Sequence, residues 1–163
     1  MKAESLKGLE DVAETLLIPL CYRAVEARQP EPLICDPRAQ EIIDQLGVDP
    51  AHLKWRPFQH VFAMLRARQY DRWIQAYLDQ HPNCVVVEIG CGLDARFDRL
   101  DNGTVRWVDM DLPEVIDLRR RFFADTERRQ MLGHSVFNLD WMNCIPPAEH
   151  YLYIAEGVFP YFD

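Results

Sequence analysis

Several features that would assign this chain to a specialised class of protein are missing from its sequence. No apolar run approaches the roughly 18 residues of a membrane-spanning helix, and the first residues lack the apolar stretch of a signal peptide. The five cysteines form no C-x-x-C pair, which argues against a disulfide framework or a zinc site and fits a reducing compartment. We therefore expect a cytoplasmic protein that spans no membrane and holds no metal.

An excess of basic residues is also lacking. The formal net charge is −8, which disfavours binding along a polyanion such as nucleic acid. Two local basic runs, residues 119–121 and 128–129, alternate with acidic residues. This pattern predicts a solvated helix face rather than a nucleic-acid surface.

The first half of the chain predicts a helical N-terminal cap over residues 1–82. A first helix is indicated by an apolar stripe, which comprises Leu9, Val12, Leu16, Leu17 and Leu20. Pro19 is expected to end or kink it. A short helix follows, with Asp36 as N-cap, Pro37 in its first turn and Gly47 just beyond its end. A longer helix is expected over residues 58–78, with a buried stripe of Val61, Phe62, Leu65, Trp73, Ile74, Tyr77 and Leu78.

The second half, residues 83–163, changes to the pattern of a parallel sheet. The β-branched run at residues 85–89 predicts a strand that is buried on both faces. Further strands are predicted at residues 105–108, more weakly at 135–137, and at 151–155, and a helix opens at Pro113. The predicted fold is therefore α/β, half of a doubly wound, Rossmann-like sheet behind the helical cap.

The most informative segment is Gly90-Cys91-Gly92, which follows the first predicted strand and leads into a helical turn. Glycine suits this place because the backbone turns tightly and must approach a ligand without an intervening Cβ. As bare text the run also satisfies the dinucleotide fingerprint G-x-G-x-x-A, and glycines at such turns can be purely structural. The loop alone therefore leaves open a nucleotide-dependent oxidoreductase and a loop that binds nothing.

Two carboxylates favour a nucleoside ligand that carries positive charge. Asp111 ends the second predicted strand, 19 residues beyond Gly92, where a carboxylate accepts hydrogen bonds from ribose hydroxyls in such folds. Glu88 precedes the first glycine by two residues. An acidic neighbour suits a pyrophosphate poorly, whereas a ligand with sulfonium and ammonium groups tolerates it. The alternative is that Glu88 merely caps nearby amides.

The wider motif resembles a known family. Residues 88–96 read Glu-Ile-Gly-Cys-Gly-Leu-Asp-Ala-Arg, and residues 108–116 read Val-Asp-Met-Asp-Leu-Pro-Glu-Val-Ile. This pairing resembles the leucine carboxyl methyltransferase family, most closely its bacterial branch of polyketide O-methyltransferases. Further segments resemble the family at residues 23–26, 36–37, 66–71, 139–141 and 155–158. The resemblance implies a class I methyltransferase fold and an S-adenosylmethionine-dependent O-methyltransferase.

The same resemblance implies that ten residues bind the cofactor. They are Arg66, Glu88, Gly90, Cys91, Gly92, Asp111, Leu112, Asp140, Trp141 and Glu156. The glycine loop would line the methionine and ribose portion, Asp111 would hold the ribose, and Leu112 would pack against the adenine. Asp140 would face the adenine amino group, and Arg66 would meet the ligand carboxylate.

Some of these positions also admit simpler roles. Arg66 and Arg68 could be surface charges, Asp140 could be a turn residue, and Arg23 could serve the ligand or substrate pocket or neither. No catalytic residue is identified. A carboxylate acceptor needs no general base at neutral pH, whereas a hydroxyl acceptor does, with His60 and His134 as the candidates considered.

The family fold has a seven-stranded sheet in the order 3-2-1-4-5-7-6, so the chain is expected to carry only the first four strands. The fourth strand would then keep a free edge, which predicts self-association or pairing with another chain. The expected methyl acceptor is a carboxylate or hydroxyl of a small, polyketide-like molecule or of a protein C-terminus. The alternative function is a truncated, noncatalytic interaction module that uses the open edge.

Overall fold

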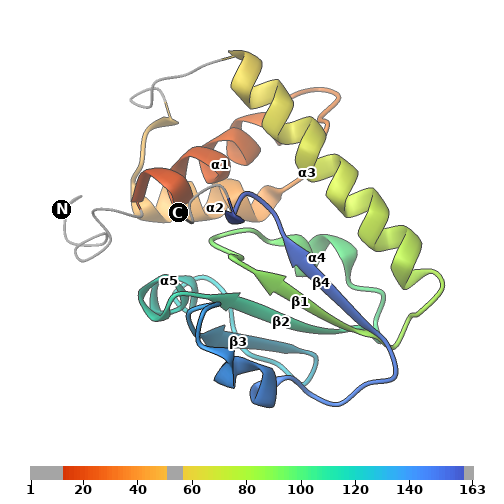
Figure 1. Ribbon diagram of the computed structural model, residues 1–163. Helices are drawn as coiled ribbons and strands as arrows, with labels where there is room; N and C mark the ends of the chain where they lie inside the picture. Colours follow the sequence, from red (N-terminus) through yellow and green to blue (C-terminus); the bar gives the residue numbers. More distant parts are fainter. Residues whose placement is uncertain (1–12, 51–56, 160–163) are drawn as a thin grey trace. The chain divides into compact units, whose positions relative to one another are not determined.

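The computed structural model describes residues 13–50 and 57–159, and the helices and strands group by their contacts into two compact units (Figure 1). The helical unit comprises residues within 1–72 together with Leu93–Ala95, and the sheet unit comprises residues within 73–92 and 96–163. In chain order the elements are α1 (Ala13–Glu26), α2 (Pro37–Leu46), α3 (Pro57–Leu78), β1 (Val85–Ile89), α4 (Arg96–Leu100), β2 (Arg106–Asp111), α5 (Pro113–Arg119), β3 (Arg129–Gly133), the 3₁₀ helix η3 (Leu139–Cys144) and β4 (Tyr151–Ala155). The expected domain boundary between residues 82 and 83 stays a prediction.

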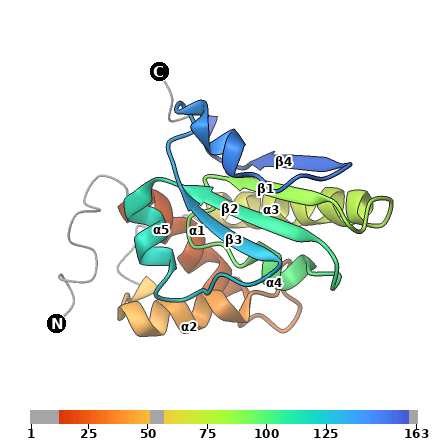
Figure 2. The ribbon, with the colours of Figure 1, turned by 90° about the horizontal axis from the view of Figure 1, so that it is seen from below.

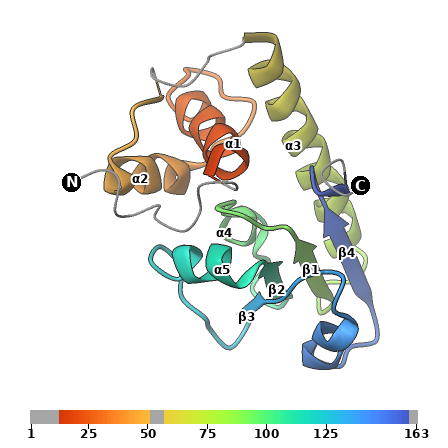
Figure 3. The same cartoon turned by 60° about the vertical axis from the view of Figure 1, so that its left-hand side comes forward.

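In the helical unit, α1 and α2 lie next to each other (Figure 3). Pro19 does not end α1, which continues to Glu26.

The prediction for α2 is confirmed at both ends. The Asp36 carboxylate accepts a hydrogen bond from the Ala39 amide at 3.0 Å, and Gly47 closes the helix in the left-handed conformation. The predicted buried face of α2 is also confirmed, and it consists of Ala39, Ile42, Ile43 and Leu46. Leu9 and Val12 of the predicted first stripe lie outside the described residues.

The predicted stripe of α3 is wrong in part. Ile74 and Leu78 are buried, but Val61, Phe62, Leu65 and Trp73 are 47–62% exposed. The buried face instead includes His60, Met64 and Ala67. Both faces of this helix carry apolar side chains, so periodicity does not say which one turns inward. The buried histidine has a polar neighbour, since its Nε2 lies 3.1 Å from a Glu26 carboxylate oxygen.

The sheet unit contains four parallel strands in the order β3-β2-β1-β4 (Figures 1 and 2). The predicted bounds of β1 and β4 are confirmed, and Val85, Val86 and Val87 are fully buried. The two faces of the sheet differ in chemistry. One face packs apolar residues from three strands against Trp141 of η3. The other face, toward α4 and α5 (Figure 2), carries the carboxylates of Glu88 and Asp109, whose Cα atoms pair across β1 and β2.

The third strand lies earlier than predicted, at Arg129–Gly133 rather than at residues 135–137. Arginine and glutamine interrupt its apolar pattern, so the run does not read as a strand. Arg129 is nevertheless buried because its guanidinium pairs with Asp109 on the neighbouring strand. The segment pairs with β2 along its whole length and buries Met131 and Leu132, and the ion pair accounts for the burial of Arg129 within it.

Within the two described ranges, no helix has the length and apolarity needed to cross a bilayer. The cytoplasmic location stays a prediction.

We expect Gly47→Ala to lower the free energy of unfolding by about 1 kcal/mol, because an alanine at φ 64° places its Cβ against the following carbonyl. Urea unfolding followed by circular dichroism measures the change. Gln45→Ala, at an exposed position of α2, is the control and should change stability by less than about 0.5 kcal/mol. Equal effects of the two substitutions would contradict the assignment of Gly47 as a required left-handed cap.

Candidate functional site

Parallel register brings three polar loops to one edge of the sheet. The last residue of β1, Ile89, pairs with Met110 of β2 and with Ala155 of β4. The residues that follow these three positions are Gly90, Asp111 and Glu156. All three were predicted to lie in the cofactor site, and they share the carboxyl edge of the sheet, where open α/β sheets bind their ligands.

The glycine loop folds back on the end of β2. The amides of Gly90 and Cys91 both donate to the Met110 carbonyl, at 2.8 and 3.1 Å. The Gly92 amide donates to Asp111 Oδ2 at 2.8 Å. Gly90 and Gly92 adopt positive φ values of 69° and 50°, which explains why glycine occupies both positions. The loop and the carboxylate at the end of β2 therefore form one connected unit.

Asp111 is poised to accept further hydrogen bonds. Its two carboxylate oxygens each take one backbone amide, Oδ2 from Gly92 and Oδ1 from Leu112, both at 2.8 Å. Each oxygen retains another acceptor site that a hydroxyl group can use. Burial raises the pKa of Asp111 above the 3.8 of an ordinary aspartate, although these two amides and Arg119 favour the ionised form.

Cys91 does not have the properties of a nucleophile. Its side chain is 3% exposed, and burial raises the pKa of the thiol well above its usual value. The nearby carboxylates of Asp109, Asp111 and Glu88 also raise it, while Arg119 opposes them. The thiol therefore stays protonated at neutral pH, and Cys91 serves as a small apolar residue in the loop.

Arg96 joins the two glutamates that were predicted to meet the ligand. Its Nη1 lies 2.5 Å from Glu88 Oε1 on β1, and its Nη2 lies 2.5 Å from Glu156 Oε2 just beyond β4. The guanidinium is 1% exposed, so this bridge lies inside the protein. The charge of Glu88 is thus compensated within the chain, and the bridge links the ends of β1 and β4.

A second cluster of buried charges holds the loop from the same sheet face. Asp109 Oδ2 lies 3.0 Å from Arg119 Nη2 and 2.7 Å from Arg129 Nε. Arg119 Nη1 donates to the Gly92 carbonyl at 2.8 Å. The prediction of a solvated basic face is therefore wrong for Arg119 and Arg129, which are 0% and 4% exposed. Sequence reasoning missed them because runs of charge ordinarily lie on the surface.

In the helical unit, Arg23 holds the part of the loop that groups with the helices. Its guanidinium lies 3.0 Å from Asp36 and 3.4 Å from Asp94, and Nη2 donates to the Leu93 carbonyl at 3.3 Å. Arg23 is 5% exposed. Its guanidinium thus binds main chain and carboxylates of the protein itself.

The remaining predicted residues occupy different environments. Leu112 begins α5 with its side chain 37% exposed. Asp140 is exposed at the start of η3, where its amide is capped by Asn138 Oδ1 at 3.1 Å. Trp141 is 3% exposed and packs in the apolar core of the sheet. Arg66 is an exposed residue of α3 in the helical unit. The cofactor roles assigned to all of these residues stay predictions.

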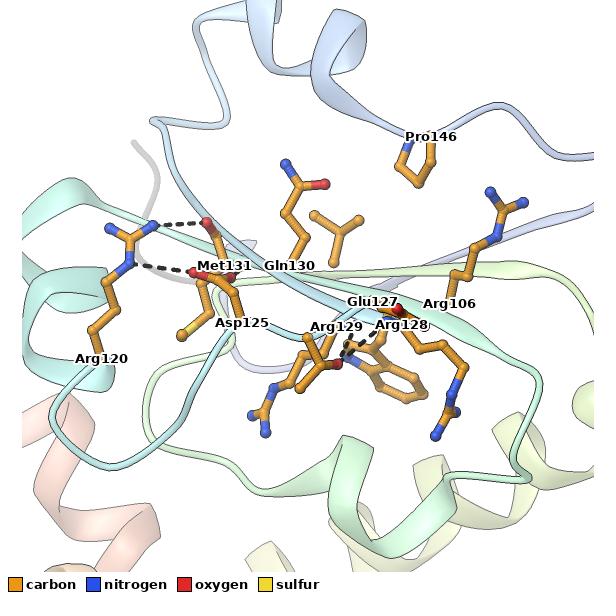
Figure 4. A pocket seen from close by; sticks show the side chains of 12 residues that line it. Arg106, Arg120, Asp125, Glu127, Arg128, Arg129, Gln130, Met131 and Pro146 are labelled. Carbon is orange, nitrogen blue, oxygen red and sulfur yellow. Dashed lines mark hydrogen bonds and ion pairs between the residues drawn. The ribbon is translucent and has the colours of Figure 1, made fainter.

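A cavity of about 500 Å³ lies elsewhere on the sheet unit, along β3 (Figure 4). Arg106, Arg128 and Pro146 are among its lining residues. Its charged groups are largely engaged: Arg120 binds the Met131 carbonyl at 3.1 Å, and Arg128 pairs with Asp101. None of the ten predicted site residues lines this cavity. The candidate site therefore remains the strand edge around the glycine loop.

Comparison with known proteins identifies the family of the chain. Residues 17–163 match the sequence model of one family, Leucine carboxyl methyltransferase. The chain is 38% identical over 154 residues to "Tetracenomycin polyketide synthesis O-methyltransferase TcmP" of Streptomyces glaucescens, covering 94% of this chain and 57% of that protein. It is 30% identical to a putative S-adenosyl-L-methionine-dependent methyltransferase of Mycolicibacterium paratuberculosis, over 92% of this chain and 57% of that one.

A fungal relative extends the comparison. The S-adenosyl-L-methionine-dependent methyltransferase dpfgK of Gibberella zeae is 28% identical, over 96% of this chain and 57% of its own length. The chain therefore spans little more than half the length of the curated relatives it matches.

Gly90→Ala should destabilise the sheet unit by more than the backbone cost alone. An added Cβ would lie 2.4 Å from Val158 Cγ2, and φ is +69°. We expect a loss of about 3 kcal/mol in the free energy of unfolding, of which about 1–2 kcal/mol is backbone strain. Chemical unfolding of Gly90→Ala, Val158→Ala and the double variant separates the two parts, because the double variant relieves only the clash.

Gly103→Ala is the matched control. Gly103 also has a positive φ, +85°, but no atom lies within 4 Å of the added Cβ. The Gly103→Ala variant should therefore lose only the stability that corresponds to backbone strain, without the loss caused by a clash. If Gly90→Ala and Gly103→Ala cost the same, close packing at Gly90 is not what requires glycine there.

Proposed function

Since this chain belongs to the leucine carboxyl methyltransferase family, we propose that its glycine-loop edge binds S-adenosylmethionine and that the protein transfers the methyl group to an oxygen acceptor. The observation that carries the proposal is the link between the Gly92 amide and Asp111 Oδ2, at the carboxyl edge of a parallel sheet. This arrangement offers a carboxylate to ribose hydroxyls beside a loop without side chains at Gly90 and Gly92.

The residues present fit such a cofactor. Asp111 keeps acceptor capacity on both oxygens, and the 37% exposed side chain of Leu112 next to it offers an apolar surface for a base. We assign the ribose to Asp111 and the adenine to Leu112, with Asp140 as a further polar contact. The loop residues Gly90, Cys91 and Gly92 are assigned to the methionine portion through their main chain.

Glu88 and Glu156 are assigned to the cationic end of the cofactor, with Arg96 as the group that orients them. Glu156 is only partly buried, whereas Glu88 is almost completely buried, with 3% of its surface exposed. We therefore expect Glu156 to make the nearer contact and Glu88 to act by holding Arg96. The assignment of Arg66 to the ligand carboxylate rests on the family resemblance alone.

S-adenosylmethionine supplies an activated methyl group on a sulfonium, which an oxygen nucleophile can displace directly. The chain's own contribution is then to hold both reactants so that the acceptor oxygen is aligned with the methyl group. A carboxylate acceptor is ionised at neutral pH and needs no base. This favours a carboxylate of a small, polyketide-like molecule or of a protein C-terminus over a hydroxyl group.

The two histidines considered as bases for a hydroxyl acceptor are placed differently. His60 is buried in the helical unit beside Glu26, and its ring packs against Tyr22 at 5.2 Å between centroids. His134 follows β3, and its amide donates to the Asp111 carbonyl at 2.9 Å. Of the two, only His134 belongs to the unit that carries the glycine loop and Asp111.

The second candidate function is a noncatalytic interaction module. Within the part of the chain that the structure describes, the strand order places β4 at an edge of the sheet, with Tyr151 and Tyr153 exposed at 36% and 54%. An edge strand that has unpaired N–H and C=O groups is a template for another strand, including that of a second copy. At the start of β4, the Tyr151 carbonyl already accepts a hydrogen bond from the Tyr77 hydroxyl at 3.1 Å, so the rest of the strand would make the pairing. Under this proposal, the chain self-associates through β4.

We expect isothermal titration calorimetry to show micromolar binding of S-adenosylhomocysteine and none of NAD. Asp111→Ala should weaken this binding at least tenfold, because it removes charge-assisted hydrogen bonds to the ribose. The control is Asp117→Ala, a carboxylate on α5 with a 78% exposed side chain, and it should leave the affinity within twofold. A folded chain that binds neither ligand and sediments as a defined dimer would support the interaction module instead.

The affinity for S-adenosylhomocysteine should also fall as the solution is acidified. The pKa of Asp111 is raised, so its carboxylate gains a proton at a higher pH than an ordinary aspartate, and the protonated group is a poorer acceptor for ribose hydroxyls. Binding is expected to be constant above this pKa and to weaken as the pH falls through it. Titrations at a series of pH values measure the profile. Asp111→Asn should flatten it, and an unchanged profile in that variant would assign the effect to another group.

A further inference from the structure

Two consecutive carbonyls of the glycine loop are each held by a buried arginine. Arg119 Nη1 donates to the Gly92 carbonyl at 2.8 Å within the sheet unit. Arg23 Nη2 donates to the next carbonyl, that of Leu93, at 3.3 Å within the helical unit. We propose that Arg119 and Arg23 are positioning residues that set the orientation of these two peptide groups and so prepare the loop to bind its ligand. This inference rests on the proposed function, because it assigns the loop to the cofactor.

Each guanidinium is itself fixed by carboxylates. Arg119 is bound by Asp109 through Nη2 at 3.0 Å, and its Cζ lies 4.3 Å from the ring centroid of Phe123. Arg23 is bound by Asp36 through Nε at 3.0 Å and lies 3.4 Å from Asp94 through Nη1. The planar fork of arginine lets one side chain bind a carboxylate and a carbonyl together in fixed geometry. Both arginines are 5% exposed or less.

Fixing a carbonyl also fixes the amide of the next residue, because the peptide group is planar and trans. Arg119 therefore sets the N–H direction of Leu93, and Arg23 sets that of Asp94. The loop has particular need of such control. Gly90 and Gly92 both adopt positive φ and, as glycines, have more accessible backbone conformations than other residues. A loop that is already ordered loses less conformational entropy when a ligand binds.

Arg129 provides an internal comparison that separates positioning from mere stabilisation. Like Arg119, it is buried, binds Asp109 Oδ2 at 2.7 Å and stacks over Phe123, at 4.5 Å. Its Nη1 reaches Asp98 at 3.2 Å instead of a loop carbonyl. The two arginines thus share one carboxylate and one aromatic ring. They differ in that Arg119 holds a loop carbonyl, whereas Arg129 reaches Asp98 and lies over Phe97, at 5.3 Å from the ring centroid. If the buried charges only stabilise the fold, the two should be equivalent.

The test compares Arg119→Lys with Arg129→Lys in the whole chain. Lysine can keep the ion pair with Asp109 but cannot also hold the Gly92 carbonyl in the same geometry. Both variants should lower the melting temperature. Arg119→Lys should weaken S-adenosylhomocysteine binding about tenfold or more by calorimetry, whereas Arg129→Lys should change it less than about twofold. Equal losses in the two variants, or no loss in a folded Arg119→Lys chain, would overturn the proposal.

Amide hydrogen exchange on the ligand-free chain makes the test independent of the proposed function. The amides of Leu93 and Asp94 should exchange faster in Arg119→Lys than in Arg129→Lys, relative to a reference amide in β1. If the parent chain binds no S-adenosylhomocysteine, the proposed function fails, yet this comparison still decides whether the arginines order the loop. Unchanged exchange at both amides would overturn the positioning role.

Arg23→Lys is the second variant if Arg119→Lys does not fold. It should accelerate exchange at Asp94 and weaken S-adenosylhomocysteine binding severalfold. Arg38→Lys, at a half-exposed position on α2 that pairs with Glu41, is its control and should change neither quantity. A folded Arg23→Lys chain with normal exchange and normal affinity would remove Arg23 from the proposal.

Discussion

The compensation of buried carboxylates by buried arginines is the interaction on which the site depends. Glu88 and Asp109 are paired in register on adjacent strands, and both point to the same sheet face. Two ionised carboxylates in a low-dielectric interior would each cost several kcal/mol without partners. Arg96, Arg119 and Arg129 supply the opposite charge. Because arginine carries several donors, the same side chains also reach Glu156 and the Gly92 carbonyl, so compensation of charge and ordering of the loop are achieved together.

The segment that follows the glycines, residues 93–96, supplies charged residues to both compact units. Asp94 groups with the helices and lies beside Arg23, whereas Arg96 groups with the sheet and bridges two strand ends. A short stretch of chain thus takes part in both compact units. Asp94 and Arg96 both contact other charged groups of the protein. Under the proposed function, contact with the ligand then falls to the main chain of the loop, Asp111 and the part-buried Glu156. Under the proposed function, a carboxylate acceptor suits this design, since no base is required of the surrounding residues.

Much of the architecture could be predicted because local chemistry decides it. At several places the side chain of a residue, or its absence, favours one backbone conformation. These places are the β-branched run of β1, the cap residues Asp36 and Gly47, and the glycines at positive φ. The approach of Gly90, Asp111 and Glu156 could also be anticipated, since parallel strands end at a common edge. The glycine motif and the Asp-Leu-Pro motif, whose pairing resembles the family, both follow strands that end at this edge.

Tertiary structure alone decided which charges and which helix face lie inside. The basic runs were expected in solvent, yet Arg119 and Arg129 are buried, because the fold brings both to Asp109 on β2, which lies 10 and 20 residues earlier in the chain. The Arg129–Asp109 pair also places an arginine inside β3, where the local pattern gave no sign of a strand. On α3 both faces are apolar, and the inner one places His60 Nε2 3.1 Å from a Glu26 carboxylate oxygen. Sequence by itself therefore determined the strand edge and the loop, where conformation depends on neighbours in the chain. The partners of the buried charges depend on distant residues, and only the fold determined those.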